Sequence, residues 1–518
     1  MISVQRVIVE LWRTILTIIL IACVVYLCQN QQKLPLPPGP RGLPLIGNIH
    51  QAPSRHPWKK FRQWHQKYGP IISLRFGQRT VIVVGSHKIA GELLNNRSAI
   101  YSSRPEMLVA GHYLNKDLHS GLKPYGLEWR AHRRLHMSVL NQSMARHYQP
   151  LQDVRSKELV YRLMNAKEFL GLFGRYATDV SMTLAYGEAV TRRNEHEIEV
   201  IDDLLSVTLQ AVLNHANLLV EAFPILDYLP SFLAPWRKQG EEIHGRMKDI
   251  YATKADRARA ATTWNWTKSF RSSKETQGMT DTSFNYIPWI LFEAAGETTP
   301  PTLSVFVLAS VLHSGAVQRA QKELDSVVGQ TRLPVFEDSP NLPYVNAFIS
   351  EVLRWRPIAP TGVPHAVQKD DEYMGYRIPK DATVFPNSWT LEFDEDVFED
   401  PWGFHPERWL QAPKPPVGAF GYGRRICPGE HFARQSLFIV MSRLLWAYNF
   451  IAPRGKDGKT VMPDPYAMTS CLISGPLPFQ TEFRPRSAEH ARVLKEEWDA
   501  AEKDNDRILE SIEQSIGD

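Results

Sequence analysis

Apolar residues recur every three to four positions along much of the chain, a spacing typical of amphipathic helices. This pattern predicts helices over 142–166, 196–221, 240–260, 284–313 and 341–354. Apolar and β-branched residues dominate two shorter regions. They predict a β-hairpin over 70–85, around a glycine-containing turn, and short strands over 373–386. We therefore expect a fold that is mainly α with minor β.

Residues from about 49 to 486 show no internal repeat and no low-complexity break, which predicts one large domain, assigned to 49–490. Two polar stretches depart from the apolar pattern. The stretch 262–282 is polar throughout, and we expect it to be a surface connection. The charged C-terminal tail, 491–518, continues a helical charge pattern that begins after Arg486, and we expect a solvated helix or a frayed end.

The N-terminus carries an apolar segment, 14–28, that contains no charged residue. Its 15 residues would form a helix of about 22 Å, shorter than a hydrocarbon core of about 30 Å. Starting at Ile8 gives 21 residues and about 31 Å, and includes Glu10 and Arg13, which can pair across three positions. We therefore assign 1–32 to an uncleaved transmembrane anchor. A cleaved signal peptide is the alternative, but no small-residue cleavage site precedes the polar QNQQK.

Basic residues flank this segment on both sides, with Arg6 and Arg13 before it and Lys33 and Arg41 after it. Charge alone therefore does not fix the orientation in a membrane. The arm that follows, 33–48, reads KLPLPPGPRGLPLIGN and is too rich in proline for a regular helix or a central strand. It is either a plain linker or a stiff arm that fixes how the domain sits on a membrane.

Composition and charge narrow the class of protein. The chain is 43% hydrophobic and 22% charged, which excludes the composition of a disordered chain. A net charge of +5 over 518 residues is mild, so we expect no nucleic-acid partner. The four cysteines, Cys23, Cys28, Cys427 and Cys471, suggest no disulfide framework. The working part of the chain therefore belongs in a reducing compartment.

Cys427 stands apart because of its neighbours in AFGYGRRICPGEHFAR. Arg424 and Arg425 precede it, and nearby positive charge lowers the pKa of a thiol. The glycines allow tight turns and close approach to a flat partner. Pro428 and the apolar pattern behind it predict a helix start, where an anion is favoured. The cysteine is then a nucleophile or a haem ligand. A nucleophile needs a histidine and a third orienting group, and only His431 stands near it in the sequence.

The stretch FGYGRRICPG resembles the haem-binding loop of the cytochrome P-450 monooxygenases. Phe420, Gly423, Arg425, Cys427 and Gly429 all match the spacing of that family. The resemblance covers roughly residues 10 to 490. It implies a single cytochrome P-450-type haem domain after an N-terminal transmembrane helix. It also implies haem b (iron protoporphyrin IX) as the cofactor, with the Cys427 thiolate as its axial ligand.

Three further motifs stand in the order of that family. The first is EVLR with the later PERW, whose first residues, Glu351 and Pro406, are 55 residues apart. A glutamate and an arginine three residues apart share a helix face and can pair. The resemblance implies that Glu351, Arg354 and Arg408 form a salt-bridged cluster with a structural role, whereas a Glu–Arg pair taken alone is usually a solvated surface pair.

The second motif is EAAGETTP, 293–300, within an apolar helical run. It is similar to the oxygen-binding helix of the family, with Ala295 where glycine is usual. By resemblance, Thr298 hydrogen-bonds the bound dioxygen and Glu297 helps to relay protons. Two prolines follow within one turn and predict a kink. Without the resemblance, these residues read equally well as a buried acid and hydroxyls within a core helix.

The third motif is WRAHRR, in which Trp129 and Arg133 are four apart and face one way. In the family this spacing supplies donors to a haem propionate, and Arg425 supplies another. Arginine suits such a carboxylate because its hydrogen bonds are charge-assisted. The plainer interpretation, a basic surface helix, is compatible, since Arg130 and Arg134 can face outward toward an acidic reductase.

The resemblance implies a monooxygenase that uses dioxygen and electrons from NADPH, supplied through an NADPH–haemoprotein reductase. Such members sit in the endoplasmic reticulum membrane with a single pass and a domain that faces the cytosol. The substrate is expected to be a hydrophobic small molecule, because the four stretches implied to line its pocket are mostly apolar. Those stretches are 105–120, 284–299, 358–366 and 467–473. Similarity to filamentous-fungal members of secondary metabolism suggests an aromatic, polyketide or terpenoid intermediate.

Three other functions are considered. A haem-thiolate isomerase or dehydratase would need no reductase, but the presence of Glu297 and Thr298 weighs against it. A non-catalytic haem-binding membrane protein would consume no oxygen with NADPH. A secreted protein would carry an N-glycan on NWT at Asn265.

Overall fold

The computed structural model describes residues 34–166, 168–191 and 193–517, together with Glu10, residues 12–14 and Thr17. Apart from these few N-terminal positions, the predicted membrane anchor, 1–32, lies outside the described residues. Arg13 Nη1 and Glu10 Oε1 form an ion pair at 3.2 Å, as their three-residue spacing predicts.

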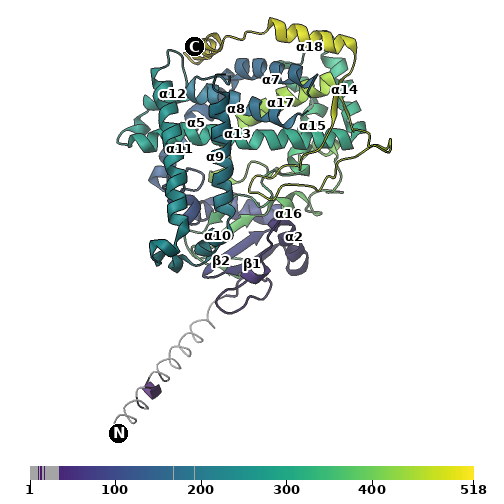
Figure 1. Ribbon diagram of the computed structural model, residues 1–518. Helices are drawn as coiled ribbons and strands as arrows, with labels where there is room; N and C mark the ends of the chain where they lie inside the picture. Colours follow the sequence, from purple (N-terminus) through teal and green to yellow (C-terminus); the bar gives the residue numbers. More distant parts are fainter. Residues whose placement is uncertain are drawn as a thin grey trace.

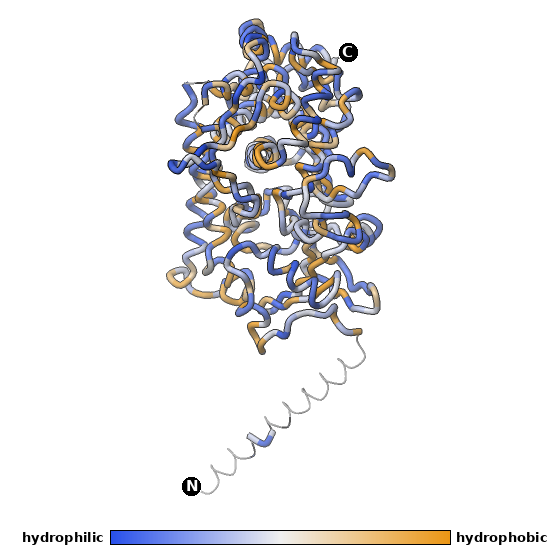
Figure 2. The backbone as a smooth tube through the Cα atoms, turned by 90° about the vertical axis from the view of Figure 1, so that its right-hand side faces the viewer, coloured by the Kyte–Doolittle hydropathy of each residue, from blue (hydrophilic) through white to orange (hydrophobic). Residues whose placement is uncertain are grey.

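Helices make up most of the described chain (Figure 1). They are α2 (Pro57–Tyr68), α3 (His87–Ala90), α4 (Ser98–Tyr101), α5 (Leu127–Leu140), α6 (Gln142–His147), α7 (Gln149–Leu163), α8 (Leu170–Tyr186), α9 (Glu195–Leu213), α10 (His215–Ala222), α11 (Pro235–Ala260), α12 (Trp266–Arg271), α13 (Asp281–Leu312), α14 (Ser314–Val327), α15 (Pro343–Trp355), α16 (Ser388–Glu392), α17 (Glu430–Ala447), α18 (Ala488–Ala500) and α19 (Asn505–Gly517). Hydrophilic and hydrophobic residues alternate along the outer helices (Figure 2), which is the pattern of helices packed by one face. Within the described part of the chain, no single helix is long and apolar enough to cross a membrane.

The strands form one small sheet and two hairpins. They are β1 (Ile71–Phe76), β2 (Arg79–Val84), β3 (His365–Ala366), β4 (Asp371–Tyr373), β5 (Tyr376–Ile378), β6 (Thr383–Pro386), β7 (Tyr448–Ile451) and β8 (Glu482–Pro485). The sheet has the order β1-β2-β6-β3, with β2 parallel to β6 and the other pairs antiparallel. The predicted hairpin over 70–85 is therefore confirmed, and the fold is mainly α with minor β. Figure 1 shows β1 and β2 at the end of the molecule nearest the N-terminus.

Two of the predicted long helices are each divided in the structure. The stretch 142–166 forms α6 and α7, which meet at Tyr148, and 196–221 falls in α9 and α10, which meet at Asn214. Asn214 is extended, and its side-chain oxygen accepts a hydrogen bond from the amide of Ala216 at 2.9 Å, which caps the second helix. An asparagine in the middle of an apolar pattern thus acts as a helix start.

α13 is the long core helix. Thr280 caps its start by accepting a hydrogen bond from the amide of Ser283 at 3.2 Å. The helix packs against α8 along its length and also contacts α11, α15 and α17. It continues through Pro300 and Pro301, although each proline removes one N–H from the helical hydrogen-bond ladder. Thr302 donates its hydroxyl to the carbonyl oxygen of Thr298 at 2.9 Å in that region.

The expectation that 262–282 is a surface connection is wrong for its centre. α12 lies within this stretch, and Trp266 and Phe270 are fully buried in the main core. The Trp266 indole donates to the Tyr148 hydroxyl at 3.0 Å. Asn265 is also fully buried. Its side-chain amide donates to the carbonyl oxygen of Ala258, and its side-chain oxygen caps α12. Its nitrogen is therefore inaccessible to a glycan in this fold.

The C-terminal tail is docked onto the domain, so the expectation of a solvated or frayed helix is wrong. α18 buries Val493 and Leu494, and α19 buries Ile508, Leu509 and Ile512. All five belong to the same core cluster as α7, α13 and α17. The charges of the tail lie on the opposite faces, which is why the sequence resembled a solvated helix.

The proline-rich arm is also fixed to the domain. The amide of Ser73 in β1 donates to the carbonyl oxygen of Pro38 at 3.0 Å. Asn48 Oδ1 accepts from the amide of Arg75 at 2.8 Å, while the amide of Asn48 donates back to the carbonyl oxygen of Arg75. The arm thus follows the outer edge of β1. It is not a free linker, the first of the two interpretations of its sequence.

Candidate functional site

The loop that carries Cys427 contains a short 3-10 turn at Gly423–Arg425 and leads into α17. The amide of Cys427 donates to the carbonyl oxygen of Phe420 at 2.9 Å, which closes the loop on itself. Pro428 and Gly429 form a turn, and the helix begins at Glu430, two residues later than the sequence suggested. The guanidinium of Arg434 lies 4.8 Å from the ring of Phe420 and holds that side chain beside the loop.

Gly423 is required by the close approach of two chain segments. It has a φ of +55°, and a Cβ there would lie 2.0 Å from the carbonyl oxygen of Leu94. Its amide donates to Asn95 Oδ1 at 2.7 Å, which ties the cysteine loop to the segment before α4. Any side chain at this position would push the loop away from its seat.

The Cys427 side chain is partly buried, and removal of the thiol from water raises its pKa. The amide of Gly429 and the charge of Arg133 oppose this shift without reversing it. The expectation that Arg424 and Arg425 lower the pKa is therefore wrong for the protein alone. Both arginines are engaged elsewhere: Arg424 donates to the Tyr125 hydroxyl at 2.7 Å, and Arg425 donates to main-chain carbonyls.

The middle of α13 lines an internal space. The stretches 284–292 and 302–311 are buried, whereas 293–301 is partly or fully exposed. Because both ends of the helix lie in the core, we infer that the exposed stretch faces a cavity and not bulk solvent. α13 also packs against α17, the helix that follows Cys427.

Glu297 and Thr298 lie on this exposed stretch. Thr298 donates its hydroxyl to the carbonyl oxygen of Ala294 at 2.9 Å. The surrounding protein raises the pKa of Glu297 even though the side chain is exposed, which is consistent with a carboxyl in an interior cavity. Glu297 therefore retains a proton at higher pH than an ordinary glutamate does.

Positive charge without acidic partners gathers beside the cysteine loop. Arg425 donates to the carbonyl oxygens of Ser102 and Lys123, and its guanidinium lies 4.2 Å from the ring of Trp129. Arg133 donates to the carbonyl oxygen of Ile426 at 2.8 Å. Burial lowers the pKa of Arg425, and the charges of two further arginines lower it more. Such a site favours the entry of an anion.

The sequence reasoning missed two residues beside this cluster, one arginine and one neutral histidine. Arg104 is buried and donates to the carbonyl oxygens of Gly121 and Pro364. His365 is buried in β3 and bonds through Nδ1 to the carbonyl oxygen of Tyr101 at 2.8 Å. Burial lowers the pKa of His365 to about 3, and the charges of Arg104 and Arg425 add to that effect. Neither residue belongs to a motif with fixed spacing.

These residues fit a haem. Its two propionates are anionic, and none of Arg104, Arg133 and Arg425 forms an ion pair with a carboxylate in the described chain. Glycine allows the cysteine loop to pack closely against the neighbouring chain segment. The α13 stretch 293–301 is partly or fully exposed between buried stretches and leaves space for a cofactor. The donor set therefore combines a cysteine sulfur with buried cations for two carboxylates.

Glu351, Arg354 and Arg408 are brought together, as the motif spacing implied. Arg354 binds Glu351 through two parallel hydrogen bonds of 2.8 Å, and both side chains are buried. Arg408 Nε lies 3.2 Å from Glu351 Oε1, and the Trp409 indole donates to Oε2 at 2.8 Å. Arg354 also donates to three carbonyl oxygens in 392–403. The cluster ties α15 to the segment that precedes the cysteine loop.

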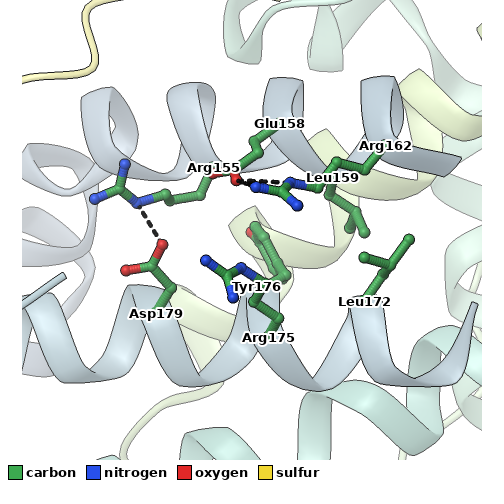
Figure 3. Close-up of a pocket in the computed structure, with 8 residues that line it drawn as sticks. All are labelled: Arg155, Glu158, Leu159, Arg162, Leu172, Arg175, Tyr176 and Asp179. Carbon is green, nitrogen blue, oxygen red and sulfur yellow. Dashed lines mark hydrogen bonds and ion pairs between the residues drawn. The ribbon is translucent and has the colours of Figure 1, made fainter. Parts of the chain in front are cut away.

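A small hollow between α7 and α8 is not the site. Its volume of about 10 Å³ has room for at most one water. Figure 3 shows that arginines and acids line it, and Arg155 pairs with Asp179 at 3.0 Å and Arg162 with Glu158 at 2.7 Å. None of its lining residues belongs to α13 or to the cysteine loop.

Comparison with known proteins gives the family. The model of the family Cytochrome P450 matches residues 37–483. The chain is 44% identical to the cytochrome P450 monooxygenase peniB of Penicillium patulum, over 92% of this chain and 90% of that protein. It is 43% identical to the monooxygenase aneD of Aspergillus aculeatus, over 92% and 93% of the two chains. The echilunin cytochrome P450 monooxygenase of Aspergillus ruber is 39% identical, over 94% and 91%.

The fold and the site thus define a haem-binding oxidoreductase. The chain belongs to the cytochrome P450 family, and it is similar to monooxygenases of filamentous fungi. It is a haem-thiolate monooxygenase that binds haem through a cysteine thiolate, uses dioxygen, and takes electrons from NADPH through a reductase.

Proposed function

We propose that Cys427 is the haem ligand of this monooxygenase. The observation that supports it most directly is the partly buried cysteine in a glycine-rich loop beside arginines that lack acidic partners. A ligating thiol must lose its proton. The high pKa of the free thiol therefore means that the iron, together with Arg133 and the Gly429 amide, stabilises the thiolate when haem is bound.

Five side chains are proposed to hold the propionates and seat the haem. Trp129, Arg133 and Arg425 were expected from the motifs, and Arg104 and His365 extend the set because both lie close enough to Arg425 for charge to act between them. The positive charge of the three arginines would offset the negative charge of the propionates, and neutral Trp129 and His365 would seat the group beside them. Phe420, Gly423 and Gly429 then shape the loop around the sulfur.

Glu297 and Thr298 are proposed to hold and move protons. The haem supplies oxygen activation, and the protein supplies protons and orients the substrate. Glu297 is suited to proton transfer because its surroundings raise its pKa toward neutral pH. Thr298 can turn its hydroxyl from the Ala294 carbonyl toward the cavity that the same stretch of α13 lines.

The proposed substrate is a hydrophobic small molecule, an aromatic, polyketide or terpenoid intermediate of secondary metabolism. Apolar side chains in the implied pocket stretches support this. Leu472 is 41% exposed in the described structure, and Ile358 and Val363 are partly exposed, whereas Val109 and Met468 are buried in the core. One relative, 39% identical, is named for echilunin.

We further propose that the protein is anchored in the endoplasmic reticulum membrane, with its domain facing the cytosol and an NADPH–haemoprotein reductase beside it. The apolar segment 14–28 supports an anchor. The turn between β1 and β2 is hydrogen-bonded to two apolar loops. The amide of Gly77 donates to the carbonyl oxygen of Ile46 in one loop, and the amide of Gln78 donates to the carbonyl oxygen of Ala222 beside the other. Their exposed side chains are Leu43, Leu45, Ile225, Tyr228 and Phe232. Protease added to intact microsomes should digest the domain, and a protected domain would contradict this orientation.

The haem assignment is tested by the spectrum of the purified protein. Reduction under carbon monoxide should give the strongly red-shifted Soret band of a thiolate–carbon monoxide complex. Cys427→Ala should abolish this band, because the sulfur is lost, while Cys471→Ala should retain it. A folded wild-type protein that binds haem without this band would overturn the assignment.

A further inference from the structure

α13 carries a second carboxylic acid, Glu293, one helical turn before Glu297. Residues four apart lie on the same face of a helix, so the two carboxyls are neighbours along α13. Glu293 Oε2 is buried and has no hydrogen-bond partner among the described residues. A buried carboxyl oxygen without a partner destabilises the fold. Its place in the core helix of an enzyme therefore calls for a functional explanation.

Other buried polar atoms without partners lie along the same part of the core. They are the hydroxyls of Tyr186 in α8 and Tyr251 in α11, and the indole nitrogen of Trp289 in α13. Their rings form one packed series: Tyr186 lies 6.2 Å from Phe292, Phe292 lies 5.4 Å from Trp289, and Trp289 lies 6.3 Å from Tyr251. Polar groups of this kind are usually bridged by ordered water.

This series reaches toward the surface at Glu188. Glu188 follows α8 closely and is partly exposed, and it binds the buried amino group of Lys254 at 2.5 Å. Burial raises the pKa of Tyr186 well above its usual value, and the charges of Glu188 and Glu293 raise it further. Tyr186 stands two residues before Glu188, and its ring packs against Phe292, the residue directly before Glu293. It is therefore close to both acids.

We propose that Glu293 is a proton-transfer residue that resupplies Glu297 from the Tyr186 side of the core. This inference rests on the proposed role of Glu297. Each step moves one proton between oxygen atoms, so no group of the relay is oxidised or reduced. When dioxygen is reduced to water, the four electrons come from NADPH through the reductase, and four protons must enter. The path is Glu188, Tyr186, Glu293 and Glu297, with water between them.

The protonation state of Glu293 suits this role. Burial raises its pKa to about 8, and the charge of Glu297 adds to the shift. At neutral pH the carboxyl therefore carries a proton that it can pass on. The titratable groups that interact with it are Tyr186 at the end of α8, and Tyr286 and Glu297 from α13. Glu188, just after α8, interacts with Tyr186, and Tyr251 of α11 interacts with Tyr286.

The first test is an infrared titration, which needs neither substrate nor turnover. The difference spectrum between wild type and Glu293→Gln should show the band of one buried protonated carboxyl at pH 7. That band should disappear as the pH rises through about 8. It should persist in Glu297→Gln, since Glu293 is intact there. A wild-type protein in which Glu293 gives no protonated-carboxyl band at pH 7 would overturn the inference.

The second test measures how many NADPH molecules are consumed for each dioxygen, with the reductase and without an added substrate. One NADPH per dioxygen forms peroxide, and two form water. Glu293→Gln should shift this ratio toward peroxide and slow water formation by about tenfold or more, because a positioned proton donor contributes on the order of 100-fold. A larger solvent deuterium isotope effect should accompany the change.

Tyr186→Phe should shift the ratio in the same direction, and it keeps the test valid if Glu293→Gln does not fold. The matched control is Tyr176→Phe, also buried in α8, whose hydroxyl donates to Ser436 away from Glu293. It should leave the ratio unchanged. A normal carbon monoxide spectrum with an unchanged ratio in Glu293→Gln and Tyr186→Phe would refute the relay while leaving the haem assignment intact. Loss of the spectrum in the wild type would instead refute the haem assignment.

Discussion

At the scale of single residues, Glu392 is the buried acid whose energetics are simplest to test. It lies at the end of α16 and accepts a hydrogen bond from the amide of Gly418 at 3.1 Å, while its second oxygen has no hydrogen-bond partner among the described residues. Burial raises its pKa to about 8, and the charge of Arg354 opposes the shift. The folded protein therefore holds a proton that the unfolded chain releases near its ordinary pKa.

Glu392→Gln should make stability less dependent on pH. A raised carboxyl pKa means that the folded state binds more protons, so wild-type stability falls as the pH rises from about 4.5 toward about 8, and then levels off. The amide cannot ionise, so the variant should gain on the order of a few kcal/mol relative to wild type between those limits. Denaturant unfolding at pH 5 and pH 8.5 measures the difference. An equal effect of the substitution at both pH values would contradict the assignment.

Thr298→Ala should uncouple NADPH oxidation from substrate oxidation. In the structure the Thr298 hydroxyl donates to the carbonyl oxygen of Ala294. Its loss removes a proton donor at the cavity while leaving the helix intact. Peroxide formed per NADPH should rise about tenfold, within the range of an acid–base contribution. Thr299→Ala is the neighbouring control. Equal peroxide yields for the two variants would remove Thr298 from proton delivery.

At the scale of elements, the Glu351 cluster sets the position of the segment before the cysteine loop. Glu351 accepts from the Arg354 and Arg408 guanidinium groups, the Trp409 indole and the amide of His405, so both carboxylate oxygens are fully used. A buried charge that loses its partner is strongly destabilised, because neither water nor another charge replaces the bond.

Arg354→Ala should therefore destabilise the protein by about 3–5 kcal/mol and lower the haem content of the purified protein. Chemical unfolding and the haem-to-protein absorbance ratio measure the two effects. Arg484→Ala is the control, because its pair with Glu482 is exposed and such pairs contribute little to stability. A loss below about 1 kcal/mol for Arg354→Ala would mean that the cluster does not support the loop.

Element prediction succeeded where apolar spacing was long and regular. α11, α13 and α15 were located within a few residues, because burial of one face imposes the helical period. α12 was missed because its buried residues, Trp266 and Phe270, are too few to show a period among polar neighbours. The start of α17 was predicted two residues too early, because proline is allowed in a turn as readily as in the first turn of a helix.

At the scale of the whole molecule, the site depends on segments that are distant in sequence. Spacing motifs identified Cys427, Arg133 and Arg425, but gave no signal for Arg104 or His365. These two meet because the amide of Ala366 beside His365 donates to the carbonyl oxygen of Ser103 beside Arg104, at 2.8 Å. Only the folded sheet creates that neighbourhood, so a single sequence could not reveal it.

The docked C-terminal helices give a prediction of global stability. Leu509 is fully buried in α19, which packs against α6 and α7. Leu509→Ala should reduce the free energy of unfolding by about 2–5 kcal/mol, through lost burial and the cavity left behind. Glu510→Ala, on the exposed side of the same helix, should stay within about 0.5 kcal/mol. Urea denaturation of both variants separates a docked helix from a frayed one, for which neither substitution would matter.

The arm along β1 has a consequence for how the protein is handled. β1 is the outermost strand of its sheet, and the main-chain groups of Ser73 and Arg75 on its free side are satisfied by Pro38 and Asn48. An uncovered strand edge pairs readily with another chain. A recombinant form shortened to begin at Leu34 keeps this cover. One shortened to begin after Asn48 would bare the edge, and we expect it to form soluble oligomers and precipitate during purification.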